Sequence, residues 1–238
     1  MSVFLYGINP AFETIRAHRR SLVKLYLAKG GENNPRIKKL KTVADQHELK
    51  NEFVSRADLF DLCQTRENQG AVIEVGDFPY MPFAEMIQAN VPRMILLDNI
   101  EDPHNVGAIL RTAETLGWNY VLLPRRGVPL VLPSVVKASA GASEFQNIAV
   151  NCAGNQYVKI ALEEGYTVVS LDGSGKISLE DIAAKHIEKL LLVVGGENSG
   201  VSHFIQMEST YVAAIHQSGK INSLNASVAA ALALYLLA

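Results

Sequence analysis

Three loops of this chain combine glycine with uncharged polar side chains, a composition typical of loops whose backbone closely approaches a ligand. The first loop, with the helix predicted after it, spans residues 98–117 (DNIEDPHNVGAILRTAETLG) and carries Asn105 and Arg111. The second loop is VGGENSGVS at 194–202, and the third is IHQSGKINSLNASVA at 215–229. Each follows an apolar run of the strand type. Open α/β sheets bind ligands beyond the carboxyl ends of their strands, so we expect the chemistry there.

Arg111 is the only cation in the first of these segments. In helical projection it lies nearly opposite the apolar stripe of its predicted helix. That stripe consists of Val106, Ile109, Leu110 and Ala113. Arg111 has two interpretations. It is either an ordinary arginine that faces solvent, or a cation at the mouth of a cleft, near the N-terminal end of its helix. In the second case, the free N–H groups of the helix end and the bidentate guanidinium would both favour phosphate binding. Asn105 is placed to cap that helix. Without further context, the first interpretation is favoured.

The second and third loops contain few groups that could act as acids or bases. Glu197 is the one carboxylate in the second loop, where such a group usually meets an amine, an arginine or backbone N–H groups. In the third loop, Ser223 and Asn225 suit a helix N-cap, and a capping role is strongly favoured for Ser223. The helix expected over 224–238 has no charged residue. A helix that is apolar all round is buried in a core or against a partner, so we expect a subunit interface there.

Several function classes are excluded by what the sequence lacks. There is no P-loop and no dinucleotide-binding fingerprint, because neither GK[ST] nor GxGxxG follows a strand. Cys63 and Cys152 are far apart, so we expect neither a metal site nor disulfides, and a reducing compartment, the cytoplasm, is predicted. The uncharged stretch 226–238 is shorter than the roughly 20 residues of a membrane span, and the start of the chain lacks a signal-peptide pattern.

Alternating strand and helix patterns predict a mostly parallel α/β sheet in the larger part of the chain. Strands are expected at 94–98, 120–123, 145–150, 166–171, 190–194 and 211–215, with helices at 105–116, 134–140, 156–164, 179–184 and 224–238. Residues 1–76 form a smaller α/β unit, long enough to fold alone. A linker at 77–91 joins it to the region 92–238.

The N-terminal stretch carries an excess of positive charge. Residues 1–41 hold nine Lys and Arg against two Asp and Glu, although the whole chain has a formal net charge of −2. This stretch could contact a polyanion such as RNA, or it could be a solvated helix face. From charge alone, the solvated face is favoured.

Together, in this order and spacing, the three segments resemble the three motifs of the SpoU-type ribose 2′-O-methyltransferases of the SPOUT superfamily. The matching residues are Asp102, Pro103, Asn105, Gly107, Arg111, Thr112 and Ala113 in the first motif, Gly195, Glu197 and Gly200 in the second, and Ser223, Leu224, Asn225, Ser227, Val228, Ala229 and Ala231 in the third. The resemblance covers residues 92–238. Residues 1–76 more loosely resemble the family's ribosomal-protein-like RNA substrate-binding domain. This sequence departs from the family by His216-Gln217 after the last strand and by Asn68 before Gln69-Gly70.

The resemblance implies a C-terminal SPOUT fold with a parallel sheet and a deep trefoil knot, a homodimer through that domain, S-adenosyl-L-methionine as methyl donor, and no metal or membrane partner. It implies a catalytic set of Arg111, Asn105, Glu197, Ser223 and Asn225. It also implies cofactor binding at Gly195, Gly196, Gly200, Ile215 and Leu224. Because an arginine keeps its proton, we expect Arg111 to bind phosphate and developing negative charge, held in place by Glu197 and Asn105.

The expected activity is methyl transfer to a ribose 2′-hydroxyl, most directly of a guanosine in large-subunit ribosomal RNA. A transfer-RNA methyltransferase is the first alternative. A non-catalytic RNA-binding or ribosome-assembly protein is the second, and measured cofactor affinity would separate it from an enzyme. A small-molecule nucleotide-binding enzyme is the third, and the missing phosphate-loop fingerprint counts against it.

Overall fold

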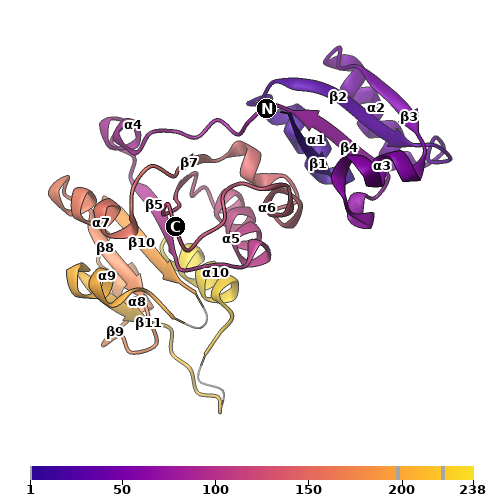
Figure 1. Ribbon diagram of the computed structural model, residues 1–238. Helices are drawn as coiled ribbons and strands as arrows, with labels where there is room; N and C mark the ends of the chain where they lie inside the picture. The colour runs from indigo at the N-terminus through magenta and orange to yellow at the C-terminus, as the bar shows by residue number, and fades with distance from the viewer. Residues whose placement is uncertain (1, 197–198, 221–222) are drawn as a thin grey trace. The chain divides into compact units, whose positions relative to one another are not determined.

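The computed structural model describes residues 2–196, 199–220 and 223–238, which form two compact units. The first consists of Met1–Pro79 and Val131–Phe145, and the second of Tyr80–Leu130 and Gln146–Ala238. The internal segment Val131–Phe145 therefore packs with the N-terminal unit. The sequence-based division, with a linker at 77–91, assigned this segment to the region 92–238. Figure 1 shows the elements of each unit.

The first unit is built on a four-stranded mixed sheet in the order β1-β4-β2-β3. Its strands are β1 (Val3–Tyr6), β2 (Leu22–Ala28), β3 (Asn51–Val54) and β4 (Ala71–Val75). β4 lies antiparallel between β1 and β2, and β3 runs parallel to β2. Strand β1 was not predicted, because only Leu5 of its four residues is buried and the strand shows no alternation.

The first unit contains α1 (Ile8–Ala17), α2 (Pro35–Gln46), α3 (Arg56–Cys63) and the 3₁₀ turn η1 (Arg66–Asn68). All of these except α1, which follows Gly7, begin at a residue whose side chain accepts from a free backbone N–H group. Asn34 caps α2, with Pro35 in its first turn. Ser55 and Asp58 cap α3 reciprocally, in a capping box.

A buried ion pair ties the internal segment into the first unit. The segment carries α6 (Pro133–Ala138) and the 3₁₀ turn η2 (Ala142–Phe145). Arg20 donates from Nε and Nη2 to the two carboxylate oxygens of Glu144, at 2.9 and 2.8 Å, and both side chains are 1% exposed. The guanidinium also lies over the ring of Phe78, 4.8 Å from its centroid. Burial raises the pKa of Glu144, and the neighbouring Arg20 opposes that rise.

The second unit is a seven-stranded sheet in the order β7-β6-β5-β10-β8-β11-β9, with every pairing parallel. Its strands are β5 (Arg93–Asp98), β6 (Tyr120–Leu122), β7 (Asn147–Ala149), β8 (Thr167–Leu171), β9 (Ile177–Ser178), β10 (Leu190–Gly195) and β11 (Tyr211–Ala214). The predicted α/β class with a parallel sheet is thereby confirmed. The trefoil knot stays a prediction.

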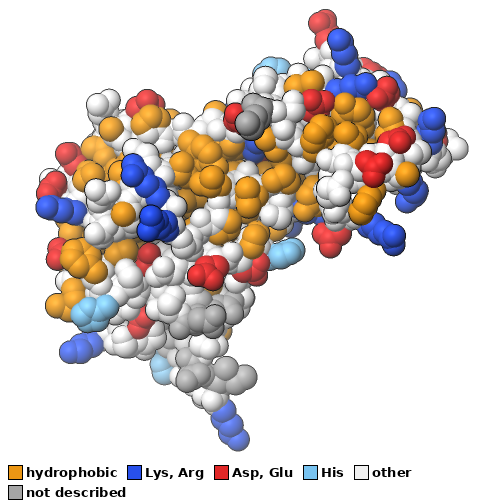
Figure 2. Space-filling view, in the orientation of Figure 1, with side chains coloured by type: hydrophobic (Ala, Val, Ile, Leu, Met, Phe, Trp, Pro, Cys, Tyr) orange, Lys and Arg blue, Asp and Glu red, His pale blue; other side chains and the backbone are white. Residues whose placement is uncertain are grey.

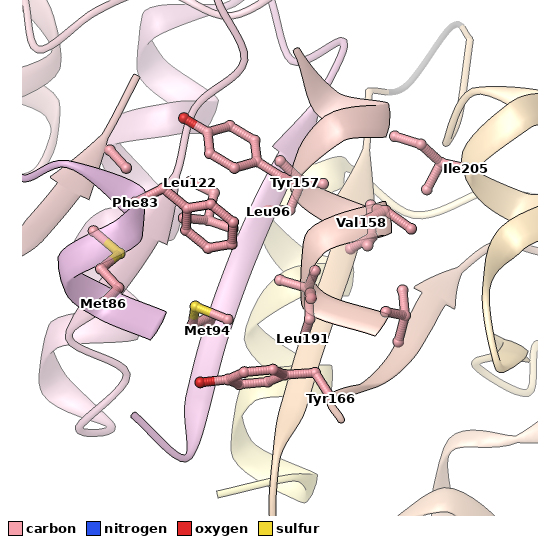
Figure 3. Packing of buried hydrophobic residues seen from close by; sticks show 14 of the residues in the cluster. Phe83, Met86, Met94, Leu96, Leu122, Tyr157, Val158, Tyr166, Leu191 and Ile205 are labelled. Carbon is pink, nitrogen blue, oxygen red and sulfur yellow. The ribbon is translucent and has the colours of Figure 1, made fainter. Parts of the chain in front are cut away.

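Helices cover this sheet on both faces (Figure 1). They are α4 (Phe83–Gln88), α5 (Pro103–Thr115), α7 (Gly154–Glu163), α8 (Leu179–Ala183), α9 (His203–Glu208) and α10 (Ala226–Leu236). On one face, Phe83 of α4 meets Tyr157 of α7 edge-on, at 4.9 Å between ring centroids, above Met94 of β5 and Leu191 of β10 (Figure 3). Burial raises the pKa of Tyr157 to about 12, so its hydroxyl stays neutral.

Helices α5 and α10 pack against each other, and a buried tryptophan fixes the second of them. Trp118 is 1% exposed and donates from its indole N–H to the carbonyl of Leu234, at 3.2 Å. The two-residue strand β9 was not predicted, and neither was helix α9, which buries only Ile205 and so shows no apolar stripe. Among the described residues, no helix combines the length and apolar character needed to cross a bilayer.

We predict that Arg20→Met lowers the free energy of unfolding by about 3–5 kcal/mol, because the Glu144 carboxylate stays buried without its counter-ion. The folded-state pKa of Glu144 is raised, so its protonation favours the folded state, and part of this loss should be recovered as the pH falls from neutral to mildly acidic. Urea unfolding followed by circular dichroism measures both effects.

The matched control is Arg16→Met, which removes an arginine from an exposed pair with Glu13 at 2.7 Å. Exposed pairs contribute about 0–1 kcal/mol, so this variant should unfold close to wild type. Equal losses of unfolding free energy in the two variants would show that the buried pair stabilises the fold no more than the exposed pair does.

Candidate functional site

The carboxyl ends of β5 and β10 lie side by side, and a buried aspartate organises the loops that leave them. Asp98 is 6% exposed and pairs in register with Gly195. Its Oδ2 accepts from the N–H of Ser202 at 2.7 Å and from Nδ2 of Asn99 at 3.2 Å, while its carbonyl accepts from the N–H of Gly196 at 3.0 Å. Asp98 was not among the predicted site residues. The sequence feature that could have indicated it is a carboxylate at the end of a fully apolar strand.

The glycines of the second loop are required by the chain itself. A side chain at Gly195 would collide with the backbone of Gly200 and Val201, and one at Gly196 with the carbonyl of Asn99. Gly200 has φ +59°, in the left-handed region. The composition of this loop predicted that its glycines allow close approach by a ligand. In the structure, the space beside Gly195 and Gly196 is filled by neighbouring chain.

A cavity of about 170 Å³ opens at these strand ends. Its lining includes all five residues predicted to bind cofactor, Gly195, Gly196, Gly200, Ile215 and Leu224, together with the predicted catalytic residue Ser223. Leu171, Val194, Ala226 and Ala229 add apolar wall. Backbone and apolar side chains thus form most of the surface, a combination that suits a flat apolar group with polar edges. The roles of these residues stay predictions.

Asp172 supplies a carboxylate to the lining of this cavity. It follows β8, and its Oδ2 accepts from Nε2 of Gln206 at 3.1 Å, while its Oδ1 accepts from the hydroxyl of Ser174 at 2.7 Å. Gln206 also donates to the carbonyl of Val201 at 2.8 Å, which links this carboxylate to the second loop. Asp172 was not among the predicted site residues, although LDGSG at 171–175 is another glycine-rich loop after a strand.

A second cavity, of about 590 Å³, shares Gly196 with the first. It is lined by Asn99, Ile100, Glu101, Asp102, Asn105, Ser199 and Asn225 as well. Here two predicted catalytic residues meet directly, because Nδ2 of Asn225 donates to Oδ1 of Asn105 at 3.0 Å. This hydrogen bond joins the first motif to the third across 120 residues of sequence.

Of the three residues expected to suit helix caps, Asn225 is confirmed as a cap, whereas Asn105 and Ser223 are not caps. Asp102, not Asn105, caps α5, accepting from the N–H of His104 at 2.9 Å. Asn225, not Ser223, caps α10: its Oδ1 accepts from the N–H groups of Ser227 at 2.9 Å and Val228 at 3.4 Å. The side chains of Asn105 and Ser223 are therefore not needed for capping, and both line cavities.

Arg111 lies apart from the cavities formed by the described residues. It is the ninth residue of α5, not near the start of that helix as the sequence suggested, and about 9 Å along the axis from Asn105. Its side chain is exposed and makes no hydrogen bond or ion pair in the described part of the chain. We expected Asn105 to hold Arg111 in place. In the structure, the side chain of Asn105 is instead hydrogen-bonded to Asn225. Glu197, the other expected partner, lies outside the described residues.

The side chains gathered here are suited to binding and orienting a ligand, and less suited to acting as nucleophiles. Asn105, Asn225 and Ser223 are neutral hydrogen-bonding groups, and the carboxylates of Asp98 and Asp172 are already hydrogen-bonded. Within residues 2–196, 199–220 and 223–238, no three His, Cys, Asp or Glu side chains cluster as metal ligands would. Such a site suits a transfer reaction that depends on alignment of two bound reactants.

Comparison with known proteins supplies matches over nearly the whole chain. Residues 92–235 match the model of the SpoU rRNA methylase family, and residues 4–81 match a model described as RNA 2′-O ribose methyltransferase substrate binding. YacO of Bacillus subtilis (strain 168), assigned to the TrmH family of tRNA/rRNA methyltransferases, is 29% identical over 98% of this chain and 93% of its own length.

Two solved structures are also similar. An rRNA methyltransferase from Sinorhizobium meliloti, crystallised with bound AdoMet, aligns with a TM-score of 0.79 and 19% identity over 99% of this chain and 86% of its own. A protein described in terms of 2-OH methylation of C/U34 on tRNA aligns with a TM-score of 0.55 and 27% identity. That alignment covers 61% of this chain and 93% of the other.

We predict that Asn225→Ala lowers the free energy of unfolding by about 1 kcal/mol, since α10 loses its cap. Asn225→Asp is the matched control, because it keeps the capping oxygen and removes only the Nδ2 donor to Asn105. Urea unfolding should place Asn225→Asp nearer to wild type than Asn225→Ala. Equal losses in the two variants would mean that the bond to Asn105, which both variants lack, and not the cap, is the stabilising contact.

Proposed function

This chain belongs to the SpoU rRNA methylase family of RNA methyltransferases, and from that premise we propose that it methylates a ribose 2′-hydroxyl of RNA with S-adenosyl-L-methionine. The observation that carries the proposal is the placement of the predicted residues. Those expected to bind the cofactor line one cavity, and the Asn105–Asn225 pair lines the cavity beside it.

The lining of the first cavity fits this cofactor. Glycine backbone at 195–196 and apolar side chains such as Ile215 and Leu224 suit an adenine ring and its polar edge. The carboxylate of Asp172 suits the positive charge of a sulfonium. When bound, S-adenosylmethionine supplies an electrophilic methyl group. The AdoMet in the Sinorhizobium structure supports the same choice.

The remaining residues then position the RNA. The Asn105–Asn225 hydrogen bond holds the ends of two helices together where the ribose must enter. Arg111, exposed and always charged, binds the phosphate next to the target and stabilises negative charge that develops on the 2′-oxygen. The hydroxyl proton leaves through that phosphate or through water. Glu197 and Ser223 complete the catalytic set.

A guanosine of large-subunit ribosomal RNA is the substrate we propose. The Sinorhizobium rRNA methyltransferase aligns with 99% of this chain, so it has counterparts to both units. The structure related to tRNA methylation aligns over 61% of this chain while covering 93% of its own, so more than a third of this chain has no counterpart in that alignment. A tRNA substrate is the second candidate, favoured by the higher identity of that match, 27%.

We further propose a homodimer in the cytoplasm, formed through α10. This helix exposes a stripe of apolar side chains, Val228, Leu232, Tyr235 and Leu236, at 47%, 41%, 72% and 38% exposure. Contiguous apolar stripes of this kind mark interaction sites more often than free surface.

The test of activity is methyl transfer from labelled S-adenosylmethionine to separate pools of ribosomal and transfer RNA from cells that lack the enzyme. We expect label on ribosomal RNA as a 2′-O-methyl nucleoside. Arg111→Ala should lose at least 10²-fold in kcat/KM with the affinity for cofactor unchanged, because a donor to transition-state charge is removed. Label on tRNA alone would favour the second candidate. Absence of both label and cofactor binding would contradict the proposal.

Arg111→Lys separates charge from geometry. It keeps the positive charge but cannot bind phosphate through two parallel N–H groups, so we expect activity well below wild type. Near-full activity of this variant would contradict the role given to the guanidinium.

For the dimer, we predict that Leu232→Lys shifts the protein from dimer to monomer in size-exclusion chromatography with light scattering. A charge placed in an apolar interface cannot be paired there. Met207→Lys is the control, since Met207 is 72% exposed on α9. A monomeric wild type, or a dimer that survives Leu232→Lys, would contradict the interface at α10.

A further inference from the structure

The first unit contains a cavity of its own, of about 450 Å³, between α3 and the turn η1. It is lined by Arg56, Ala57, Phe60, Asp61, Arg66 and Asn68. None of these residues belongs to the three motifs or to the cavities of the second unit. The mechanism described above therefore leaves this cavity without a role.

Phe60 is the unusual member of this lining. Its neighbour Leu59 is fully buried in the core of the first unit, whereas the ring of Phe60 is 39% exposed and faces the cavity. An aromatic ring left partly in solvent costs hydrophobic stabilisation. A ring in a cavity wall also offers a flat surface on which another ring can stack.

Two guanidinium groups share the cavity with this ring. Arg56 and Arg66 are exposed, and neither side chain makes a hydrogen bond or ion pair within the part of the chain described. Asp61 is the single carboxylate of the lining, and it forms no ion pair with either arginine there. The cavity thus presents two free cations, one free anion and an aromatic face.

The turn that forms one wall is held by internal hydrogen bonds. Asn68 donates from Nδ2 to the carbonyl of Thr65 at 2.9 Å and accepts from the N–H of Gly70 at 3.0 Å. From α6, Lys137 donates to the carbonyl of Glu67 at 2.8 Å. The wall exists before any ligand arrives, which lowers the ordering cost of binding.

We propose that this cavity binds one unstacked base of the RNA substrate, so that the first unit reads a single-stranded loop. The base stacks on Phe60, Arg56 and Arg66 contact the phosphates on either side, and Asp61 accepts hydrogen bonds from N–H groups of the base edge. Guanine is favoured over uracil, because its Watson–Crick edge offers two adjacent N–H donors to a carboxylate. This inference rests on the proposed function for its ligand class.

The charge distribution of the first unit favours RNA binding in a local pocket and not across a broad basic face. On the side of this unit visible in Figure 2, blue Lys and Arg side chains are interspersed with red Asp and Glu. Residues 1–80 hold 12 Lys and Arg against 10 Asp and Glu, which is a small excess. Duplex RNA bound by charge alone needs a larger field, whereas a stacked base needs a ring and a few cations.

The experiment measures the affinity of the full chain for a labelled RNA hairpin with a guanosine-containing loop, by fluorescence anisotropy. A uridine loop and a fully paired duplex serve as comparison probes. We expect Phe60→Leu to weaken binding to the guanosine loop about tenfold or more and to leave duplex binding unchanged, with Phe60→Trp restoring the affinity. Asp61→Asn should reduce the preference for guanosine over uridine.

Matched variants test the charges and the fold. Arg56→Ala or Arg66→Ala should reduce the slope of log affinity against log salt by about 0.7, while Lys38→Ala, on the exposed side of α2, should leave the slope unchanged. Phe204→Ala controls for loss of an exposed aromatic elsewhere, since Phe204 is 55% exposed on α9. Thermal unfolding of Phe60→Leu and Phe60→Trp shows whether both variants remain folded.

The outcomes separate this inference from the proposed function. If wild type methylates RNA but Phe60→Leu binds and methylates it with unchanged Kd and KM, the pocket is not a base-binding site. If wild type binds the loop through Phe60 yet transfers no methyl group to any RNA pool, the pocket stands and the proposed activity fails.

Discussion

The absence of space for a side chain beside Gly195 and Gly196 is the constraint on which the site depends. At the ends of β5 and β10, the second loop turns back so closely that its own backbone fills the position of a Cβ at Gly195, and the carbonyl of Asn99 fills that at Gly196. The Asp98 carboxylate fixes the same crossing through the N–H of Ser202. Both cavities open beside this crossing, so their shape follows from a contact between main chains.

Much of the second unit could be predicted from sequence, because its strands are apolar runs and its helices have one apolar stripe. The parallel sheet and the starts of the long elements followed from that pattern, and the residues assigned to the cofactor do line one cavity. Helix α9 and strand β1 were missed because each buries a single residue, Ile205 and Leu5, and so shows no apolar pattern, and β9 is only two residues long. Capping at Asn105 was predicted wrongly because Asp102, three residues earlier, competes for the same role.

Other features depend on contacts that no local pattern contains. Asp98 and Asp172 are buried or cavity-lining carboxylates, and each has a hydrogen-bond partner more than thirty residues away. The pairing of Asn105 with Asn225 joins two motifs, each of which indicated only a helix start when taken alone. For Arg111 the motif is informative but contacts are absent among the described residues. It matches the family motif, yet its side chain is exposed and has no partner in the described part of the chain.

The buried pair of Arg20 and Glu144 bears on the order in which the protein can be made. The ribosome releases the N-terminus first, and domains commonly fold as they emerge. Arg20 belongs to the start of the chain, but its carboxylate partner appears 124 residues later, after β5, α5 and β6 of the second unit. The first unit is therefore a discontinuous domain. It reaches its final packing only after a large part of the second unit has been synthesised, so a fragment ending at the linker would expose a core that lacks one of its walls.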